Sequence, residues 1–102
     1  MSEKPLAGKV ALITGSYRNL GAVTAETFAS YGAKVILNDL PSPDLYEVCD
    51  KVLAQVRAHG VEAVAIPADL SKSDEVRRLC REAIQAFGKV DILVHAIAFA
   101  NR

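Results

Sequence analysis

The sequence predicts an α/β fold with a doubly wound parallel sheet, in which four strands alternate with three helices. Short apolar runs alternate along the 102 residues with longer segments whose apolar residues recur at helical spacing. The joining segments are short, and no linker or internal repeat interrupts them. We expect right-handed crossovers and the doubly wound strand order 3-2-1-4. In that arrangement, the first two helices lie on one face of the sheet and the third on the other.

The composition is that of a folded globular protein, with 51% hydrophobic and 24% charged residues. Twelve basic and twelve acidic residues give a net charge of zero, and neither sign forms a block. Nucleic acid and anionic membranes are therefore excluded as expected partners, and a small molecule or another protein is favoured. The N-terminal residues lack the apolar stretch of a signal peptide, so we expect a cytoplasmic protein without membrane spans.

The two cysteines, Cys49 and Cys80, do not stand at metal-ligand spacing, and we expect no metal site. Both are predicted to be buried, reduced packing residues. The predicted topology places them on opposite faces of the sheet, which argues against a disulfide.

The first strand is expected over residues 9–14, a run rich in β-branched residues that ends at Gly15. Helical spacing from Leu20 onward predicts a helix that ends before Gly32, since a glycine commonly follows the last turn. The apolar positions of this helix are Leu20, Val23, Thr27, Phe28 and Tyr31.

The second strand is expected over residues 34–38. Ser42 then stands as an N-cap with Pro43 in the first turn of a second helix. This helix is predicted to end at His59 and Gly60. Its apolar stripe comprises Leu45, Val48, Cys49, Val52 and Val56.

The third strand is expected within residues 61–70. A third helix follows, with Ser71 and Asp74 as a capping pair and Gly88 as its end. The near-continuously apolar residues 90–97 predict the fourth strand. The apolar stripe of the third helix comprises Val76, Leu79, Cys80, Ala83 and Phe87.

The segment from Thr14 to Gly21, TGSYRNLG, connects the first strand to the first helix, where backbone N–H groups can hold a pyrophosphate. Gly15 and Gly21 fit a turn at which phosphate oxygens approach the backbone closely. Asp39 stands eighteen residues after Gly21, the spacing of a carboxylate that binds adenosine ribose hydroxyls. An ordinary connection, with Asp39 forming a turn before Pro41, is the alternative interpretation.

These residues resemble the short-chain dehydrogenase/reductase family. The resemblance runs through LAGKVALITG at 6–15, GAKVILNDL at 32–40, ADLS at 68–71 and FGKVDILVHAIA at 87–98. It implies a Rossmann-type fold over residues 1–102, the N-terminal, NAD(P)-binding half of the family, and a homo-oligomer. NAD is the expected cofactor, with NADP less favoured.

The resemblance also implies roles for individual residues. It places Asp39 on the adenosine ribose, Asp69 and Leu70 beside adenine, and Ala96 near the ribose on the nicotinamide side. Asn19 stands where the family usually has the middle glycine of its turn. The residues implied around the phosphates are Gly15, Ser16, Arg18, Leu20 and Gly21.

We expect the chain to be the truncated N-terminal part of an NAD(P)-dependent oxidoreductase that transfers hydride between nicotinamide and a carbonyl or alcohol substrate. The family uses a tyrosine with a lysine four residues later, and none of the three tyrosines has that lysine. Catalytic residues are therefore expected beyond Arg102, where the small-molecule substrate would also bind.

Two alternatives stay open. His95 to Ala98 replaces the usual Asn-Asn-Ala-Gly and resembles the divergent enoyl-thioester reductases of the family, although we expect His95 to be a hydrogen-bonded structural residue. The other alternative is a stand-alone nucleotide-binding module without catalysis.

Overall fold

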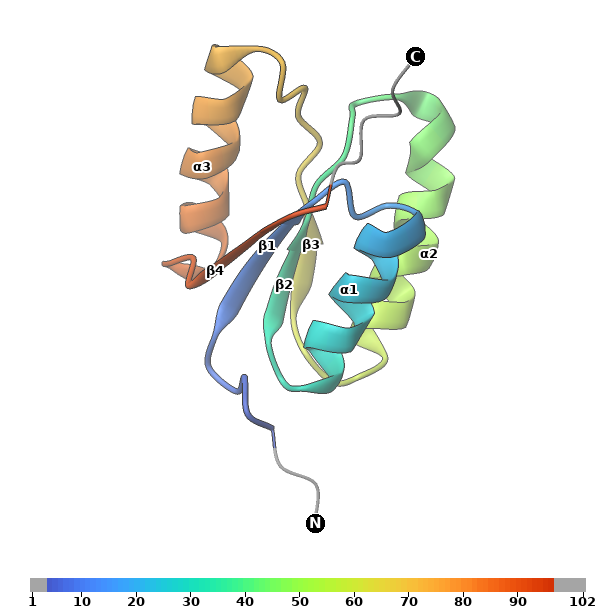
Figure 1. Ribbon diagram of the computed structural model, residues 1–102, viewed down its shortest axis with the longest axis vertical. Helices are drawn as coiled ribbons and strands as arrows, with labels where there is room; N and C mark the ends of the chain where they lie inside the picture. The colour runs from blue at the N-terminus through green and yellow to red at the C-terminus, as the bar shows by residue number, and fades with distance from the viewer. Residues whose placement is uncertain (1–3, 97–102) are drawn as a thin grey trace.

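A computed structural model describes residues 4–96, in which strands and helices alternate (Figure 1). The strands are β1 (Val10–Thr14), β2 (Lys34–Leu37), β3 (Ala63–Ala65) and β4 (Ile92–His95). The helices are α1 (Asn19–Ser30), α2 (Pro43–Arg57) and α3 (Ser73–Phe87). The strands pair in parallel in the order β3-β2-β1-β4, which confirms the predicted topology.

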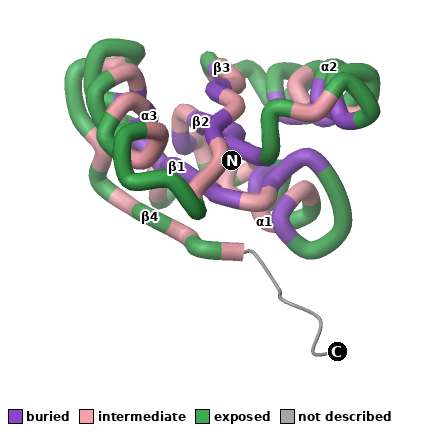
Figure 2. Tube along the Cα trace, turned by 90° about the horizontal axis from the view of Figure 1, so that it is seen from above, coloured by how far each residue is buried: buried purple, intermediate pink, exposed green. Residues whose placement is uncertain are grey.

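The sheet separates two hydrophobic clusters, with α1 and α2 on one face and α3 on the other (Figures 1 and 2). Successive side chains of a strand point to opposite faces. Ala11 and Ile13 of β1 accordingly belong to the cluster under α1 and α2, whereas Val10 and Leu12 belong to the cluster under α3. β1 is thus buried on both faces. Its packing fixes the position at which the following turn begins.

The buried face of α1 differs from the predicted one. Leu20 is 71% exposed and Val23 is 63% exposed, whereas Gly21, Ala25 and Ala29 face the sheet. Small side chains allow the helix axis to approach the sheet closely, and that close contact determines which side of α1 is buried. The expected stripe was therefore wrong at its exposed positions, whereas Phe28 is partly buried against the same cluster. The exposed positions are Leu20, Val23, Thr27 and Tyr31.

The stripe of α2 is confirmed at Leu45, Cys49, Val52 and Val56, which are the buried residues of the helix. Val48, the fifth predicted position, is only partly buried. The helix ends at Arg57 rather than His59, because the backbone N–H groups of His59 and Gly60 already form tight turn hydrogen bonds. Ser42 is its N-cap residue, with extended backbone, and makes no side-chain capping bond within the described residues.

Two expectations about α3 are corrected. Its N-cap is Lys72, and the Ser71 hydroxyl donates to the Asp69 carboxylate at 2.7 Å instead of pairing with Asp74. Cys80 is exposed, because Leu79 and Ala83 are the residues that α3 buries.

The outer strands are shorter than predicted. Within 61–70, only Ala63–Ala65 is strand, although the N–H groups of Ile66 and Ala68 still donate to the carbonyls of Leu37 and Asp39. Pro67 lies between them and has no N–H to continue the ladder. The described part of the fourth strand begins at Ile92, and residue 97, its predicted end, lies outside the described residues.

Candidate functional site

A cavity of about 580 Å³ lies at the carboxyl ends of the strands, a volume typical of small-molecule sites. The segment that follows each of the four strands contributes residues to the wall of this cavity. In a doubly wound sheet, this is where the order of strands reverses and ligands bind. The lining residues are Gly15, Arg18, Asn19, Leu20, Gly21, Asp39, Leu40, Asp69, Leu70, Ser71, His95 and Ala96.

The turn between β1 and α1 requires residues that tolerate left-handed backbone. Gly15 has a φ of 64° and Asn19 a φ of 57°, which makes Asn19 the non-glycine residue with positive φ in the described part of the chain. Asparagine adopts this conformation more readily than most residues, so it can replace a glycine here without changing the path of the backbone.

The N-terminus of α1 faces the cavity and carries positive electrostatic potential. The first N–H groups of a helix have no intrahelical acceptor, and the helix dipole adds partial positive charge there. Arg18 is the N-cap residue with extended backbone, and no acidic residue stands in the first turn. This end of the cavity is therefore suited to an anion.

The Asp39 carboxylate is buried beside the turn. Its Oδ1 accepts a hydrogen bond from the backbone N–H of Leu40 at 2.8 Å and lies 3.9 Å from the Arg18 guanidinium. Its Oδ2 accepts from the backbone N–H of Tyr17 at 3.4 Å. A carboxylate has about four acceptor positions, so Asp39 retains capacity for hydroxyl donors from a ligand.

Ser16 is the predicted site residue that the cavity lining does not include. It is completely buried, and its N–H donates to the Asn38 carbonyl at 2.8 Å. Its hydroxyl oxygen accepts from the Asn38 N–H at 2.9 Å. These bonds join the turn after β1 to the end of β2. Ser16 therefore stabilises the residues that line the cavity without lining it itself.

Asp69 is held at the rim by the start of α3. Its Oδ1 accepts from the N–H and the hydroxyl of Ser71, and its own N–H donates to the Glu75 carboxylate. The hydrogen bonds from Ser71 lower the pKa of Asp69 below its usual value. Asp69 is thus a fixed anion beside Leu70.

At the end of β4, His95 Nδ1 lies 2.8 Å from the Thr14 hydroxyl, which links β4 to β1. The predicted structural hydrogen bond of His95 is therefore present. The side chain also lines the cavity, as do Leu40 and Ser71, and sequence reasoning included none of these three in the site. Their positions in the sequence could have indicated that they line the site, because each lies at the carboxyl end of a strand or beside a predicted site residue.

The described residues contain no phenol positioned for proton transfer in this cavity. Tyr17 belongs to the turn, but its side chain is buried away from the cavity, and burial raises the pKa of its phenol far above the usual value. Among residues 4–96, no group of three or more His, Cys, Asp and Glu side chains is placed to hold a metal ion. No helix of these residues is long and apolar enough to cross a membrane.

Comparison with known proteins shows a match between residues 9–101 and the family model of short chain dehydrogenases. Short chain dehydrogenase/reductase nsrJ of Aspergillus novofumigatus is 44% identical over 89 residues, which cover 87% of this chain and 33% of that protein. The 3-oxoacyl-(acyl-carrier-protein) reductase of Synechocystis sp. is 37% identical over 90 residues, which cover 88% of this chain and 35% of the reductase.

Solved structures give the same result. A structure described as a dehydrogenase from Burkholderia cenocepacia with bound NADP has a TM-score of 0.85 and 36% identity, covering 93% of this chain and 36% of that one. NAD+-bound xylitol dehydrogenase has a TM-score of 0.81 and 34% identity, covering 88% of this chain and 33% of the other. The chain spans about a third of the length of the relatives that it matches.

Proposed function

Because this chain belongs to the short-chain dehydrogenase family, we propose that residues 1–102 are the N-terminal, NAD(P)-binding part of an oxidoreductase. The proposed reaction is hydride transfer between nicotinamide and a carbonyl or alcohol substrate, with NAD as the favoured cofactor. The observation that carries this proposal is the cavity in which the glycine turn, the N-terminus of α1 and Asp39 meet.

The pyrophosphate is proposed to lie against the turn and the start of α1. Gly15, Asn19 and Gly21 line this part of the cavity, and their backbone can approach phosphate oxygens closely. Arg18 adds a full positive charge from a half-exposed position. The uncharged first turn of α1 supports the fit, because it presents no carboxylate to repel a phosphate.

The adenosine half is proposed to lie over the ends of β2 and β3. Asp39 would accept hydrogen bonds from the ribose hydroxyls, using acceptor positions that its protein donors leave available. Leu70 would contact the adenine ring, while Asp69 would accept hydrogen bonds from a polar edge of that ring. The dinucleotide would then extend toward Ala96, which lines the cavity at the end of β4.

When bound, the nicotinamide supplies or accepts the hydride. The residues described here would bind and orient the cofactor, and the proton transfer would be carried out by residues beyond Arg102. A neutral phenol needs a neighbouring cation to exchange a proton near neutral pH, and none of the three tyrosines is followed four residues later by a lysine.

Calorimetric titration of the protein with NAD tests the proposal. We expect saturable binding that Asp39→Ala weakens about tenfold or more, since a hydrogen bond to a charged group contributes roughly 1.5–3 kcal/mol. Asp50→Ala removes an exposed carboxylate from α2, outside the cavity lining, and is the matched control. If neither NAD nor NADP binds the unaltered protein, the proposed function is wrong.

Reduction of an enoyl thioester is the second candidate, and His95 with Ala96 at the cavity favours it. The two reactions differ in the catalytic pair that the longer protein would supply. A Tyr-x3-Lys sequence beyond residue 102 would support carbonyl chemistry, whereas Tyr-x6-Lys would support enoyl reduction. Activity assays of the longer protein with ketones and with enoyl thioesters decide between them.

A further inference from the structure

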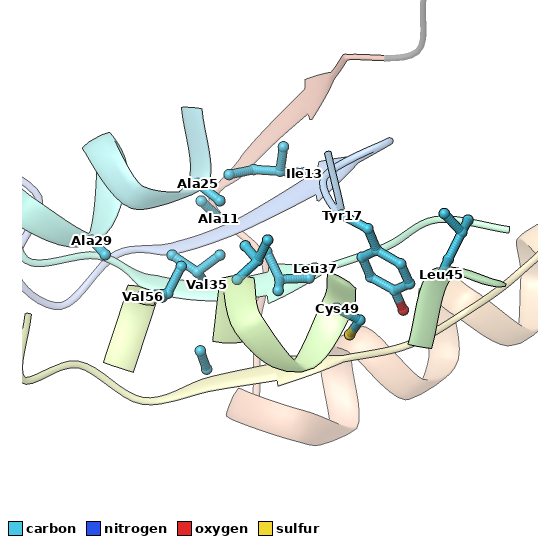
Figure 3. Packing of buried hydrophobic residues seen from close by; sticks show 12 residues of the cluster. Ala11, Ile13, Tyr17, Ala25, Ala29, Val35, Leu37, Leu45, Cys49 and Val56 are labelled. Atoms are coloured by element: carbon cyan, nitrogen blue, oxygen red, sulfur yellow. The ribbon is translucent and has the colours of Figure 1, made fainter. Parts of the chain in front are cut away.

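Tyr17 has the largest side chain among the completely buried residues, although it belongs to the turn that lines the cavity. Its ring extends away from the cavity to α2, where it packs beside Leu45 and Cys49 (Figure 3). The phenol end of the ring lies beside the Cys49 side chain (Figure 3). Connecting segments usually carry their side chains on the surface, so this turn has an unusual anchor in the core.

The backbone of the same residue contacts the carboxylate proposed to bind the ribose. The Tyr17 N–H donates to Asp39 Oδ2 at 3.4 Å, and the guanidinium of the next residue, Arg18, lies 3.9 Å from Asp39 Oδ1. The position of the Tyr17 backbone therefore affects both oxygens of Asp39. Tyr17 therefore connects α2, which its ring contacts, to the Asp39 carboxylate at the cavity.

We propose that Tyr17 is a positioning residue for the dinucleotide: its ring fixes the glycine turn against α2 and so holds Asp39 in the orientation that receives the ribose hydroxyls. This inference rests on the proposed function. It concerns the adenosine half of the ligand, since Asp39 is the residue through which Tyr17 acts.

The ring, rather than the hydroxyl, is the part of Tyr17 that provides the anchor. A buried aromatic side chain removes roughly 150–250 Å² from water, which is a large contribution for one residue in a short turn. A thiol is only a weak hydrogen-bond partner, so the contact between the phenol and Cys49 adds little. Tyr17→Phe should thus keep the anchor, and Tyr17→Ser should remove it.

The experiment measures NAD affinity by calorimetry in a double-mutant cycle, at a temperature at which circular dichroism shows every variant folded. In the unaltered background we expect Tyr17→Ser to weaken NAD binding about tenfold, within the usual range for coupled residues in contact. In the Asp39→Ala background, the same change should weaken binding by less than about twofold, the limit expected of uncoupled sites. Tyr17→Phe should keep NAD affinity within about twofold of the unaltered protein.

Val56→Ala is the control for general loss of core packing. Val56 is completely buried in the same cluster but lies near the opposite end of α2. The Val56 change should weaken NAD binding by less than about twofold in both backgrounds, because Val56 lies at the other end of α2 from the Tyr17 ring (Figure 3). If Tyr17→Ser fails to fold, Tyr17→Leu takes its place, since it keeps an apolar side chain but loses the reach of the ring.

Equal weakening by the Tyr17 change in both backgrounds would overturn the inference, as would equal weakening by Val56→Ala and Tyr17→Ser. Loss of affinity in Tyr17→Phe would show that the ring is not the anchor. These outcomes are distinct from failure of the proposed function, in which the unaltered protein binds neither NAD nor NADP.

Discussion

Gly21 of α1 packs directly against the backbone of Gly15 in the preceding turn. A Cβ at position 21 would lie 2.7 Å from the Gly15 carbonyl carbon and 2.8 Å from the Ser16 Cα. The sequence predicts that Gly21 lies where the backbone must approach a phosphate. The structure gives this glycine a role that needs no ligand, because α1 can meet the end of β1 only if residue 21 has no side chain.

Substitution of Gly21 should therefore affect stability as well as binding. We expect Gly21→Ala to lower the free energy of unfolding by about 2–3 kcal/mol, the upper range for overpacking, because the backbone of the turn must move. Gly60→Ala is the control, since a Cβ there meets nothing within 4 Å and costs only the strain of its positive φ. Urea denaturation of both variants measures the difference, and equal effects would contradict the packing role of Gly21.

The left-handed backbone of Asn19 gives a second prediction. Asn19→Gly should fold with unchanged or slightly higher stability, because glycine adopts the observed φ of 57° without strain. Asn19→Val should cost about 1–2 kcal/mol, since a β-branched residue strongly disfavours this conformation. Thermal unfolding compares the two variants, and a Val variant as stable as the Gly variant would show that residue 19 does not need left-handed backbone.

Preference between the two cofactors should depend on Asp39 and Arg18. The additional phosphate of NADP would face the Asp39 carboxylate, and like charges at ~4 Å repel by roughly 4 kcal/mol at an effective dielectric constant of about 20. Arg18 opposes this effect, because a guanidinium can pair with that phosphate. We expect tighter binding of NAD than of NADP, and a smaller difference in Asp39→Ala.

Calorimetry with both dinucleotides measures the ratio of affinities, and Arg18→Ala supplies the matched comparison. Removal of Arg18 should increase the preference for NAD. Tighter binding of NADP by the unaltered protein would show that Arg18 outweighs Asp39.

Acidification should destabilise the fold in part through Asp91. Its carboxylate accepts a hydrogen bond from the Val10 N–H at 2.9 Å and lies 3.0 Å from the Lys89 ammonium. The hydrogen bond from Val10 is the main reason that the pKa of Asp91 lies below its ordinary 3.8, and the contact with Lys89 lowers the pKa further. A group whose pKa is lower in the folded state contributes stability above its unfolded pKa, and this contribution is lost as the pH falls through the folded pKa.

Urea denaturation at a series of pH values, from about 5 to about 2, tests this expectation. The free energy of unfolding should decrease across that range, and less steeply in Asp91→Asn. The difference between the two proteins should persist in about 0.5 M salt, which screens the Lys89 pair more than the backbone hydrogen bond. Identical slopes for the two proteins would exclude a contribution from Asp91.

The sequence by itself determined the order of the elements and the topology of the sheet. Apolar runs of strand length, apolar residues at helical spacing and the glycines between them are local signals, and short connections permit few arrangements of a parallel sheet. The same local signals located the turn before α1 and the acid after β2, because the carboxyl ends of parallel strands lie at one edge.

Tertiary contacts decided which side of an element is buried and what each turn residue does. Leu20 and Val23 gave the stronger hydrophobic signal in α1, yet Ala25 and Ala29 face the sheet, because only small side chains allow so close an approach. Tyr17 belongs to a turn, and its ring is buried because α2 is in place to receive it (Figure 3). Hydrophobic spacing describes one element at a time, whereas burial depends on the distance between elements, and that distance exists only in the folded chain.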